Sequence, residues 1–89
     1  MRSLRTTKQF ERDLRRAKRR RKNLEKLWTV VEILRRRGQL APRYRPHRLS
    51  GEWQAFWECH IEGDWLLIWH EREDALVLVR TGTHTDLFG

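Results

Sequence analysis

Three histidines and one aspartate are spaced so that they could support acid–base chemistry. His60 and Asp64 flank a short turn in ECHIEGDWLLIW, so we expect them to lie near each other. His84 belongs to the terminal segment RTGTHTDLFG, where Gly82 lets the chain bend and direct the imidazole across a surface. His47 lies upstream, in YRPHRLSGEW. Imidazoles titrate near neutrality, and a neighbouring carboxylate fixes the tautomer of the ring.

These residue types suit the cleavage of RNA by attack of the ribose 2′-hydroxyl on its own 3′-phosphate. The reaction needs a base for the 2′-hydroxyl, an acid for the 5′-oxygen leaving group, and positive charge near the phosphorane. Imidazoles can perform either proton transfer, and Arg80, the first residue of the terminal segment, supplies a guanidinium. The route requires no metal or cofactor, and DNA, which lacks the 2′-hydroxyl, would resist it.

A zinc site is the alternative for the same four residues, His47, His60, Asp64 and His84. Their spacing matches no recognised zinc pattern, so the sequence favours acid–base chemistry without a metal. His70 stands beside a charged turn and is expected to be a structural or surface residue.

Positive charge is concentrated in the first half of the chain. Residues 1–48 hold 18 of the 20 Lys and Arg residues but only 4 of the 12 acidic ones, and the net charge is +8. Such asymmetry is typical of a protein that docks on a polyanion, and abundant arginine favours bidentate contacts with phosphates. A face that only maintains solubility is the simpler interpretation. Attachment to a membrane surface is disfavoured, because the basic segment lacks a broad aromatic face.

The hydrophobic pattern predicts an α+β fold of order β-α-α-β-β-β, with two N-terminal helices packed on a small twisted, mainly antiparallel sheet. A short strand is expected over 1–6, and Thr7 offers an N-cap for a helix that opens at Lys8. Phe10, Leu14 and Ala17 fall on one apolar face of this helix. The opposite face is cationic and comprises Lys8, Arg12, Arg15, Arg19 and Lys22.

Asn23 is the expected cap of a second helix, with Gly38 as its terminator. Its predicted buried stripe consists of Leu24, Leu27, Trp28, Val31 and Leu34. Residues 39–48 are expected to form an extended loop, followed by strands over 53–61, 65–70 and 75–83. Trp53 shares strand parity with Trp57, as Trp65 does with Trp69, so core or sheet-face packing is favoured over a base-stacking platform.

The length of 89 residues predicts one domain, 1–89, with one core and no enclosed cavity, so the active site should be an open, shallow face. The single cysteine, Cys59, excludes an internal disulfide and is consistent with a cytoplasmic location. The longest apolar run, residues 65–69, is far shorter than a membrane span, so no membrane partner is expected.

The motifs HRLSGEW, ECHIEGDWLLIW and RTGTHTDLFG, with KQFERDL in the first helix, resemble the YafQ branch of the RelE/ParE toxin superfamily of bacterial toxin–antitoxin modules. The resemblance extends over essentially the whole chain. It implies a ribosome-dependent mRNA interferase, which cuts the message in the ribosomal A site and is neutralised by an antitoxin. The catalytic set implied by the motifs is His47, His60, Asp64 and His84. Arg80 is then expected near the phosphate, and Phe88 is expected to help place the mRNA base.

In this family-based scheme His84 is the general acid and His47 or His60 the general base, while Asp64 orients an imidazole or shares in proton transfer. Gly63 replaces a usual proline, which is expected to loosen the geometry between His60 and Asp64. Trp57 stands where many relatives have arginine, which removes one plausible phosphate contact.

The partners implied are a cognate acidic antitoxin, ribosomal RNA and mRNA, with the cationic helix face on the ribosome. The free protein is expected to be monomeric and to form a higher-order complex with the antitoxin. Two alternatives are a catalytically silent nucleic-acid- or ribosome-binding protein and a ParE-like inhibitor of DNA gyrase. The gyrase inhibitor has no evident use for three imidazoles.

Overall fold

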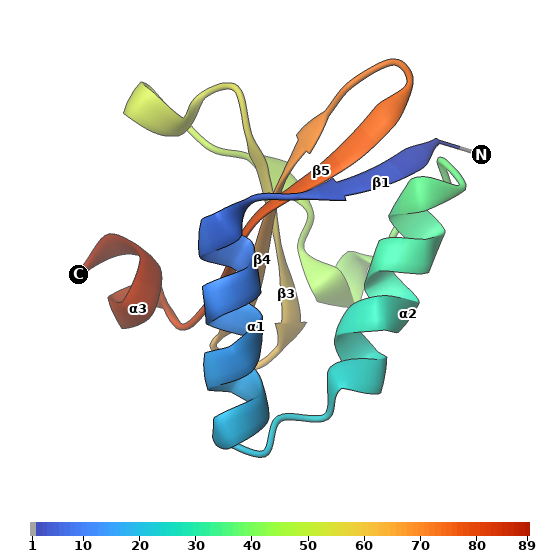
Figure 1. Cartoon of the computed structure of the whole chain (residues 1–89). Coiled ribbons are helices and arrows are strands. Elements are labelled where there is room, and N and C mark those ends of the chain that lie inside the picture. The colour runs from blue at the N-terminus through green and yellow to red at the C-terminus, as the bar shows by residue number, and fades with distance from the viewer. Residues whose placement is uncertain (1) are drawn as a thin grey trace.

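The computed structural model describes residues 2–89 as a five-stranded sheet with helices on both faces (Figure 1). The elements are β1 (Ser3–Thr6), α1 (Lys8–Arg19), α2 (Leu24–Arg35), β2 (His47–Arg48), β3 (Trp57–Glu62), β4 (Trp65–Glu71), β5 (Ala75–Gly82) and α3 (His84–Phe88). Two 3₁₀ turns, η1 (Pro42–Tyr44) and η2 (Gly51–Trp53), flank β2. The predicted α+β class is confirmed, and residue 1 of the expected first strand lies outside the described part of the chain.

The strand order of the sheet is β1-β5-β4-β3-β2. β1 runs parallel to β5, and every other neighbouring pair is antiparallel. β2 replaces part of the extended loop that was predicted over 39–48, and it pairs His47 with Glu58 and Arg48 with Trp57. A strand of two residues is too short to show an alternating pattern, so the sequence did not reveal it.

Both long helices begin where the sequence predicts. The Thr7 hydroxyl accepts a hydrogen bond from the Phe10 N–H at 3.0 Å, and the Asn23 side chain accepts one from the Glu25 N–H at 3.1 Å. At the end of α2 the left-handed residue is Arg37, with φ 61°, and not the glycine. Gly38 still closes the helix, because its N–H donates to the Ile33 carbonyl at 2.8 Å.

The prediction that Trp28 belongs to the buried stripe of α2 is wrong, since its side chain is 39% exposed. The residues of α2 that are buried are Leu27, Val30, Val31 and Leu34. Trp28 lies about 100° round the helix from Leu27, at the edge of this stripe and facing outward.

The sheet separates two apolar clusters, where the sequence led us to expect a single core. The larger cluster lies between the sheet and helices α1 and α2, and it contains Phe10, Leu27 and Trp69. The smaller cluster lies on the opposite face, where Leu66 and Ile68 pack with Leu87 of α3. The second cluster fixes the terminal helix on the side of the sheet away from α1 and α2.

Strand β3 begins four residues later than predicted, because residues 51–53 form η2 and Gly51 adopts a left-handed φ of 65°. The predicted parity of Trp53 and Trp57 is therefore wrong. Trp53 packs on the smaller cluster, whereas Trp57 packs on the larger one and stacks on Trp69 with ring centroids 6.4 Å apart. Within residues 2–89, no helix combines the length and the apolar character that a membrane crossing requires.

Candidate active site

An open cleft of about 350 Å³ lies beside the β3–β4 turn. It is lined by Arg43, Arg45, His60, Gly63, Asp64 and His84. His60 comes from β3, and Asp64 from the following turn. His84 is the first residue of α3, a helix that the sequence analysis did not predict. The cleft thus brings together three of the four predicted catalytic residues from segments far apart in the chain.

His84 is held by Asp64 through two hydrogen bonds. The Asp64 Oδ1 accepts from the His84 backbone N–H at 3.1 Å and also contacts the His84 Nδ1. The side-chain hydrogen bond from His84 is the main cause that lowers the pKa of Asp64, with its backbone N–H second. An ionised Asp64 fixes a proton on Nδ1 of His84 and leaves Nε2 for proton transfer.

His60 is oriented by the backbone of the β3–β4 turn, where Asp64 had been expected to act. Its Nδ1 lies 2.9 Å from the Gly63 carbonyl oxygen, which can only accept, so Nδ1 carries the proton and Nε2 is left with a lone pair. Gly63 has φ 52°, a left-handed conformation that the usual proline could not adopt. The left-handed glycine carries the carbonyl that His60 Nδ1 contacts, and the looser geometry expected from the loss of proline stays a prediction.

His47 reaches this group through Glu58, a residue that the sequence analysis missed. Its Nε2 lies 3.2 Å from the Glu58 Oε1, and its Nδ1 lies 2.8 Å from the Arg45 carbonyl oxygen. Both ring nitrogens of His47 are thus engaged. Glu58 is 4% exposed, and its Oε2 has no hydrogen-bond partner within residues 2–89. Its sequence signal was a carboxylate two residues before a histidine in a strand, which puts both on one face.

Glu58, His60 and His84 form the centre of the cluster. One potential ligand atom from each lies within 4.8 Å of the other two. The ring centroids of His60 and His84 are 5.8 Å apart, so both imidazoles can reach the oxygen atoms of a single phosphodiester. Carboxylate oxygen and imidazole nitrogen are also donors that suit Zn²⁺ or Cu²⁺.

Phe88 lies one helical turn beyond His84 on α3. Its side chain is 44% exposed, with its ring centroid 6.4 Å from that of His84 and 5.5 Å from that of Trp53. Trp53 supports one side of the ring and leaves much of it open to solvent. His70 lies apart from the cluster, and its Nδ1 is 3.0 Å from the Ala55 carbonyl oxygen, which agrees with a structural role.

Arg80, expected near the phosphate, is held by a buried carboxylate of α1. Its Nε lies 2.7 Å from Asp13 Oδ2 and its Nη2 3.2 Å from Asp13 Oδ1. The Asp13 side chain is 0% exposed and also accepts from the Thr81 N–H at 3.1 Å. Arg80 is not among the residues that line the cleft.

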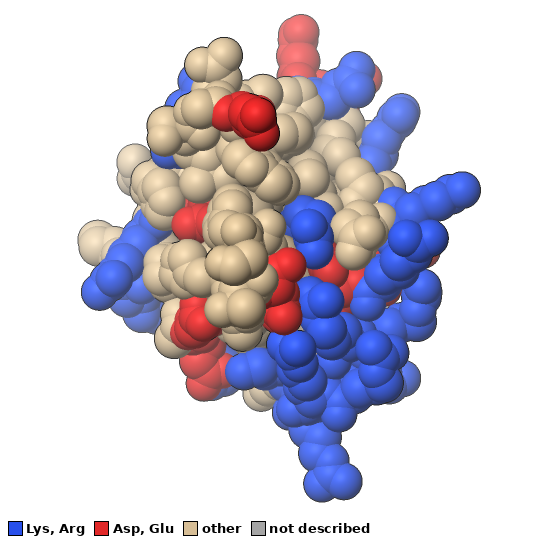
Figure 2. Space-filling model, turned by 90° about the vertical axis from the view of Figure 1, so that its left-hand side faces the viewer, with Lys and Arg blue, Asp and Glu red and all other residues tan. Residues whose placement is uncertain are grey.

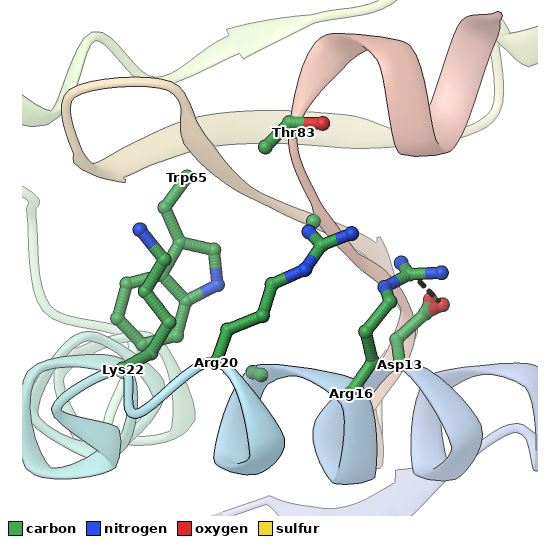
Figure 3. A pocket seen from close by; sticks show the side chains of 8 residues that line it. Asp13, Arg16, Arg20, Lys22, Trp65 and Thr83 are labelled. Carbon is green, nitrogen blue, oxygen red and sulfur yellow. Dashed lines mark hydrogen bonds and ion pairs between the residues drawn. The ribbon is translucent and has the colours of Figure 1, made fainter.

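The same side of α1 also secures α3. Figure 3 shows Arg16 and Arg20 extending from α1 toward the segment that leads into α3. Arg20 donates to both carboxylate oxygens of Asp86, at 2.7 and 3.2 Å, and Arg16 lies 3.6 Å from the same group. Asp86 in turn completes a capping box with Thr83. The ion pairs therefore connect α1 to the helix that carries His84.

The predicted cationic face of α1 is exposed along its whole length. Lys8, Arg12, Arg15 and Arg19 of α1 are all exposed, and so is Lys22, which follows the end of the helix at Arg19 and does not lie on it as predicted. Figure 2 shows Lys and Arg side chains gathered into a dense cluster on one side of the molecule.

The fold and the site thus define a class of protein: small and α+β, with a basic helix and a cleft of paired imidazoles and carboxylates. Residues 2–89 match the family model of the bacterial toxin of type II toxin–antitoxin system, YafQ. The mRNA interferase toxin YafQ of Escherichia coli K12 is 35% identical over 82 residues, which cover 91% of this chain and 89% of that protein.

Solved structures agree with this match over nearly the whole chain. The YafQ chain in the E. coli DinJ–YafQ toxin–antitoxin complex has a TM-score of 0.91 and 34% identity, covering 99% of this chain and 98% of that one. A copper-bound mutant toxin from Helicobacter pylori has a TM-score of 0.95 and 34% identity, covering 99% of this chain and 100% of that one. The chain belongs to the YafQ family of toxins of bacterial type II toxin–antitoxin systems.

Proposed function

We propose that this toxin is an mRNA interferase that cuts messages on the ribosome, by attack of the ribose 2′-hydroxyl on its own 3′-phosphate. The observation that carries the proposal is the pair of imidazoles, His60 and His84, with ring centroids 5.8 Å apart. Each has its Nδ1 bound by the β3–β4 turn, which leaves its Nε2 for the substrate. A general base and a general acid on either side of one phosphate are what this reaction needs.

His60 is the general base in this mechanism. The Gly63 carbonyl fixes the proton on Nδ1, so Nε2 can accept the proton of the 2′-hydroxyl. His47 suits this role less well, because both of its ring nitrogens already face acceptors, at Arg45 and Glu58. The 2′-oxygen forms a bond to phosphorus, and the bond from phosphorus to the 5′-oxygen breaks.

His84 is the general acid that protonates the departing 5′-oxygen. Asp64 stabilises the protonated imidazole and fixes its orientation through the Nδ1 contact. The products are a 2′,3′-cyclic phosphate and a 5′-hydroxyl, so the step consumes no cofactor. Glu58 holds His47 beside the cluster, where a protonated His47 imidazole would add positive charge near the phosphorane.

Two further residues have supporting roles. Phe88 stacks on the base next to the cut, which agrees with its exposed ring beside His84. The Nε and Nη2 of Arg80 already bind Asp13, so a phosphate would compete with this carboxylate for them. A direct contact of Arg80 with the phosphate stays a prediction.

The partners proposed are a ribosome carrying mRNA and an acidic antitoxin. The E. coli relative has been solved with DinJ, and an acidic antitoxin would complement the cationic face of this chain electrostatically. In this proposal the exposed cations of α1 contact ribosomal RNA, and the toxin acts in the cytoplasm, where ribosomes carry mRNA. The free toxin is monomeric.

Primer extension on an mRNA in a purified translation reaction tests the function. The wild-type protein should produce cuts in phase with codons, and His84→Gln should abolish them. His70→Gln is the matched control and should cut like the wild type, because His70 lies outside the cleft and bonds only the Ala55 carbonyl. Ribosome binding without any cuts would favour the silent binder, whereas inhibition of supercoiling by DNA gyrase would favour the ParE-like alternative.

The proposed mechanism does not depend on a metal, although Glu58, His60 and His84 could hold one. A bound ion would act as a Lewis acid, but it would also occupy ring nitrogens that proton transfer needs. Cleavage should therefore persist when the toxin is treated with a chelator that is removed before the Mg²⁺-containing ribosomes are added, and it should decline when Zn²⁺ or Cu²⁺ is added. Loss of activity on chelation, restored by a metal, would contradict this mechanism.

A further inference from the structure

Two arginines of the η1 segment line the catalytic cleft and have no role in the mechanism so far. Arg43 and Arg45 lie on the same cleft as His60 and His84. Both are exposed, and neither forms an ion pair with any residue of the described chain, 2–89. Their guanidinium groups are therefore available to an anionic ligand in the cleft.

The arginines on the other side of the site already form ion pairs. Arg80 and Arg16 contact the buried carboxylate of Asp13, and Arg20 binds Asp86. A phosphate would have to compete with these carboxylates for the same donors. Arg43 and Arg45 are thus the cations of this cleft that can bind a phosphate without breaking an ion pair.

The backbone fixes Arg45 in place. Arg45 ends η1 in the left-handed region with φ 49°, which is uncommon for a residue with a side chain. This conformation presents its carbonyl to His47 Nδ1 at 2.8 Å, while its side chain lines the cleft. One residue therefore both orients an imidazole of the cluster and brings a positive charge to it.

Arg43 also connects the cleft with a second hollow. This neighbouring hollow of about 270 Å³ is lined by Lys26, Thr29, Arg43, Tyr44, Ile61 and Glu62. The Arg43 guanidinium lies over the Tyr44 ring, 4.7 Å from its centroid, and donates to the Tyr44 hydroxyl at 2.9 Å. An RNA strand that leaves the cleft past Arg43 would enter this hollow.

We propose that Arg43 and Arg45 form a phosphate-binding subsite for single-stranded RNA on the wall of the cleft. Arg45 binds the phosphate at the cut, and Arg43 binds the adjacent phosphate where the strand passes toward the second hollow. Guanidinium groups suit this task, because they offer paired donors to phosphate oxygens. The subsite rests on the proposed function, but it can be measured without catalysis.

The test uses a fluorescent single-stranded RNA oligonucleotide with 2′-O-methyl at every ribose, which binds but cannot be cut by 2′-hydroxyl attack. Its affinity is measured by anisotropy over a range of NaCl concentrations. Each phosphate contact on a single strand contributes about 0.7 to the slope of log K against log salt. Arg43→Gln and Arg45→Gln should each reduce the slope by about 0.7, and Arg45→Lys should retain it. Arg72→Gln is the matched control, since it removes one exposed charge from the β4–β5 turn and should leave the slope unchanged.

A wild-type slope in both glutamine variants would overturn the subsite, as would an equal reduction in Arg72→Gln. Amide NMR shifts of Gly63 and Asp64 on RNA addition give a second readout. The RNA-induced changes in these chemical shifts should be smaller in Arg43→Gln and Arg45→Gln than in the wild type, and unchanged in Arg72→Gln. Primer extension with the wild-type protein separates the two proposals. Missing cuts would defeat the proposed function, whereas normal cuts with unchanged slopes would defeat only the subsite.

Discussion

Replacing Asp86 by alanine should release the terminal helix from α1 and reduce catalysis far more than it reduces stability. Helix α3 has only five residues, too few to be stable in isolation. It is held by burial of Leu87, by the capping box between Asp86 and Thr83, and by the bidentate contact from Arg20. The Arg20 hydrogen bond is also the main cause that lowers the pKa of Asp86 far below its usual range. The variant removes the Arg20 contact and the half of the capping box in which the Asp86 carboxylate accepts from the Thr83 N–H, while the bond from the Asp86 N–H to the Thr83 hydroxyl remains.

The expected loss of stability is small. Loss of a capping interaction costs about 1 kcal/mol. The ion pair with the exposed Arg20 is screened by solvent and adds little to this figure. For a domain of this size, about 1 kcal/mol corresponds to a decrease in Tm of about 4–8 °C. The Asp86→Ala protein should therefore remain folded at the temperature of the assay.

The expected loss of activity is larger, because His84 and Phe88 both lie on α3. A displacement of about 1 Å in a catalytic group can cost about a hundredfold in rate. We expect Asp86→Ala to lower kcat on programmed ribosomes at least about tenfold, and Asp86→Asn, which keeps an acceptor for the Thr83 N–H, to lie between it and the wild type. Asp74→Ala, in the exposed β4–β5 turn, is the control. A wild-type kcat in Asp86→Ala, with the predicted decrease in Tm, would refute the reasoning.

Three other outcomes follow from the structure. Burial, with the Glu58 charge as a second cause, raises the pKa of Cys59 to about 12, so iodoacetamide should label it slowly in the native protein and rapidly in urea. Charge reversal at Arg15 and Arg19 should weaken ribosome sedimentation, most at low salt, without changing the cleavage products; salt-resistant binding would exclude α1 as the docking surface. The pKa of Asp64 is lowered on folding from 3.8, so its pair with His84 stabilises the fold above that pH and is lost as the pH falls through the lower, folded value. Denaturant titrations should therefore show an advantage of wild type over Asp64→Asn near about pH 5 that shrinks below about pH 4, and an advantage constant down to about pH 2 would contradict this assignment.

The sequence predicted the helices and the main strands because their signals are local. Thr7 and Asn23 are strong N-caps, and apolar residues at helical spacing follow each of them. The errors occurred where a local signal was ambiguous. Trp28 is apolar but lies at the edge of its stripe, and Trp53 precedes the strand because Gly51 turns the chain into η2. Parity arguments fail when the start of a strand is misplaced.

The site was predictable as a set of residue types, but its pairings were not. Spacing put Asp64 beside His60, yet in the structure Asp64 binds His84, which is 20 residues further along the chain. That pairing depends on α3, whose five residues carry almost no periodic signal. Glu58 was overlooked for a related reason, since a carboxylate in a strand normally faces solvent, and only the fold shows that it is buried among imidazoles.

A chain this small has few side chains available for positioning the imidazoles of the cleft, and the backbone positions two of them. The carbonyls of Gly63 and Arg45 orient His60 and His47, and each belongs to a residue with left-handed φ. A left-handed residue turns its carbonyl away from the regular direction of a strand or helix and toward a nearby donor. A glycine in the sequence can indicate such a turn, as at Gly63. Arginine rarely adopts a left-handed conformation, so the sequence gives no indication of the turn at Arg45. The orientation of the cluster was therefore encoded in turn geometry, and spacing alone could identify the imidazoles without identifying what holds them.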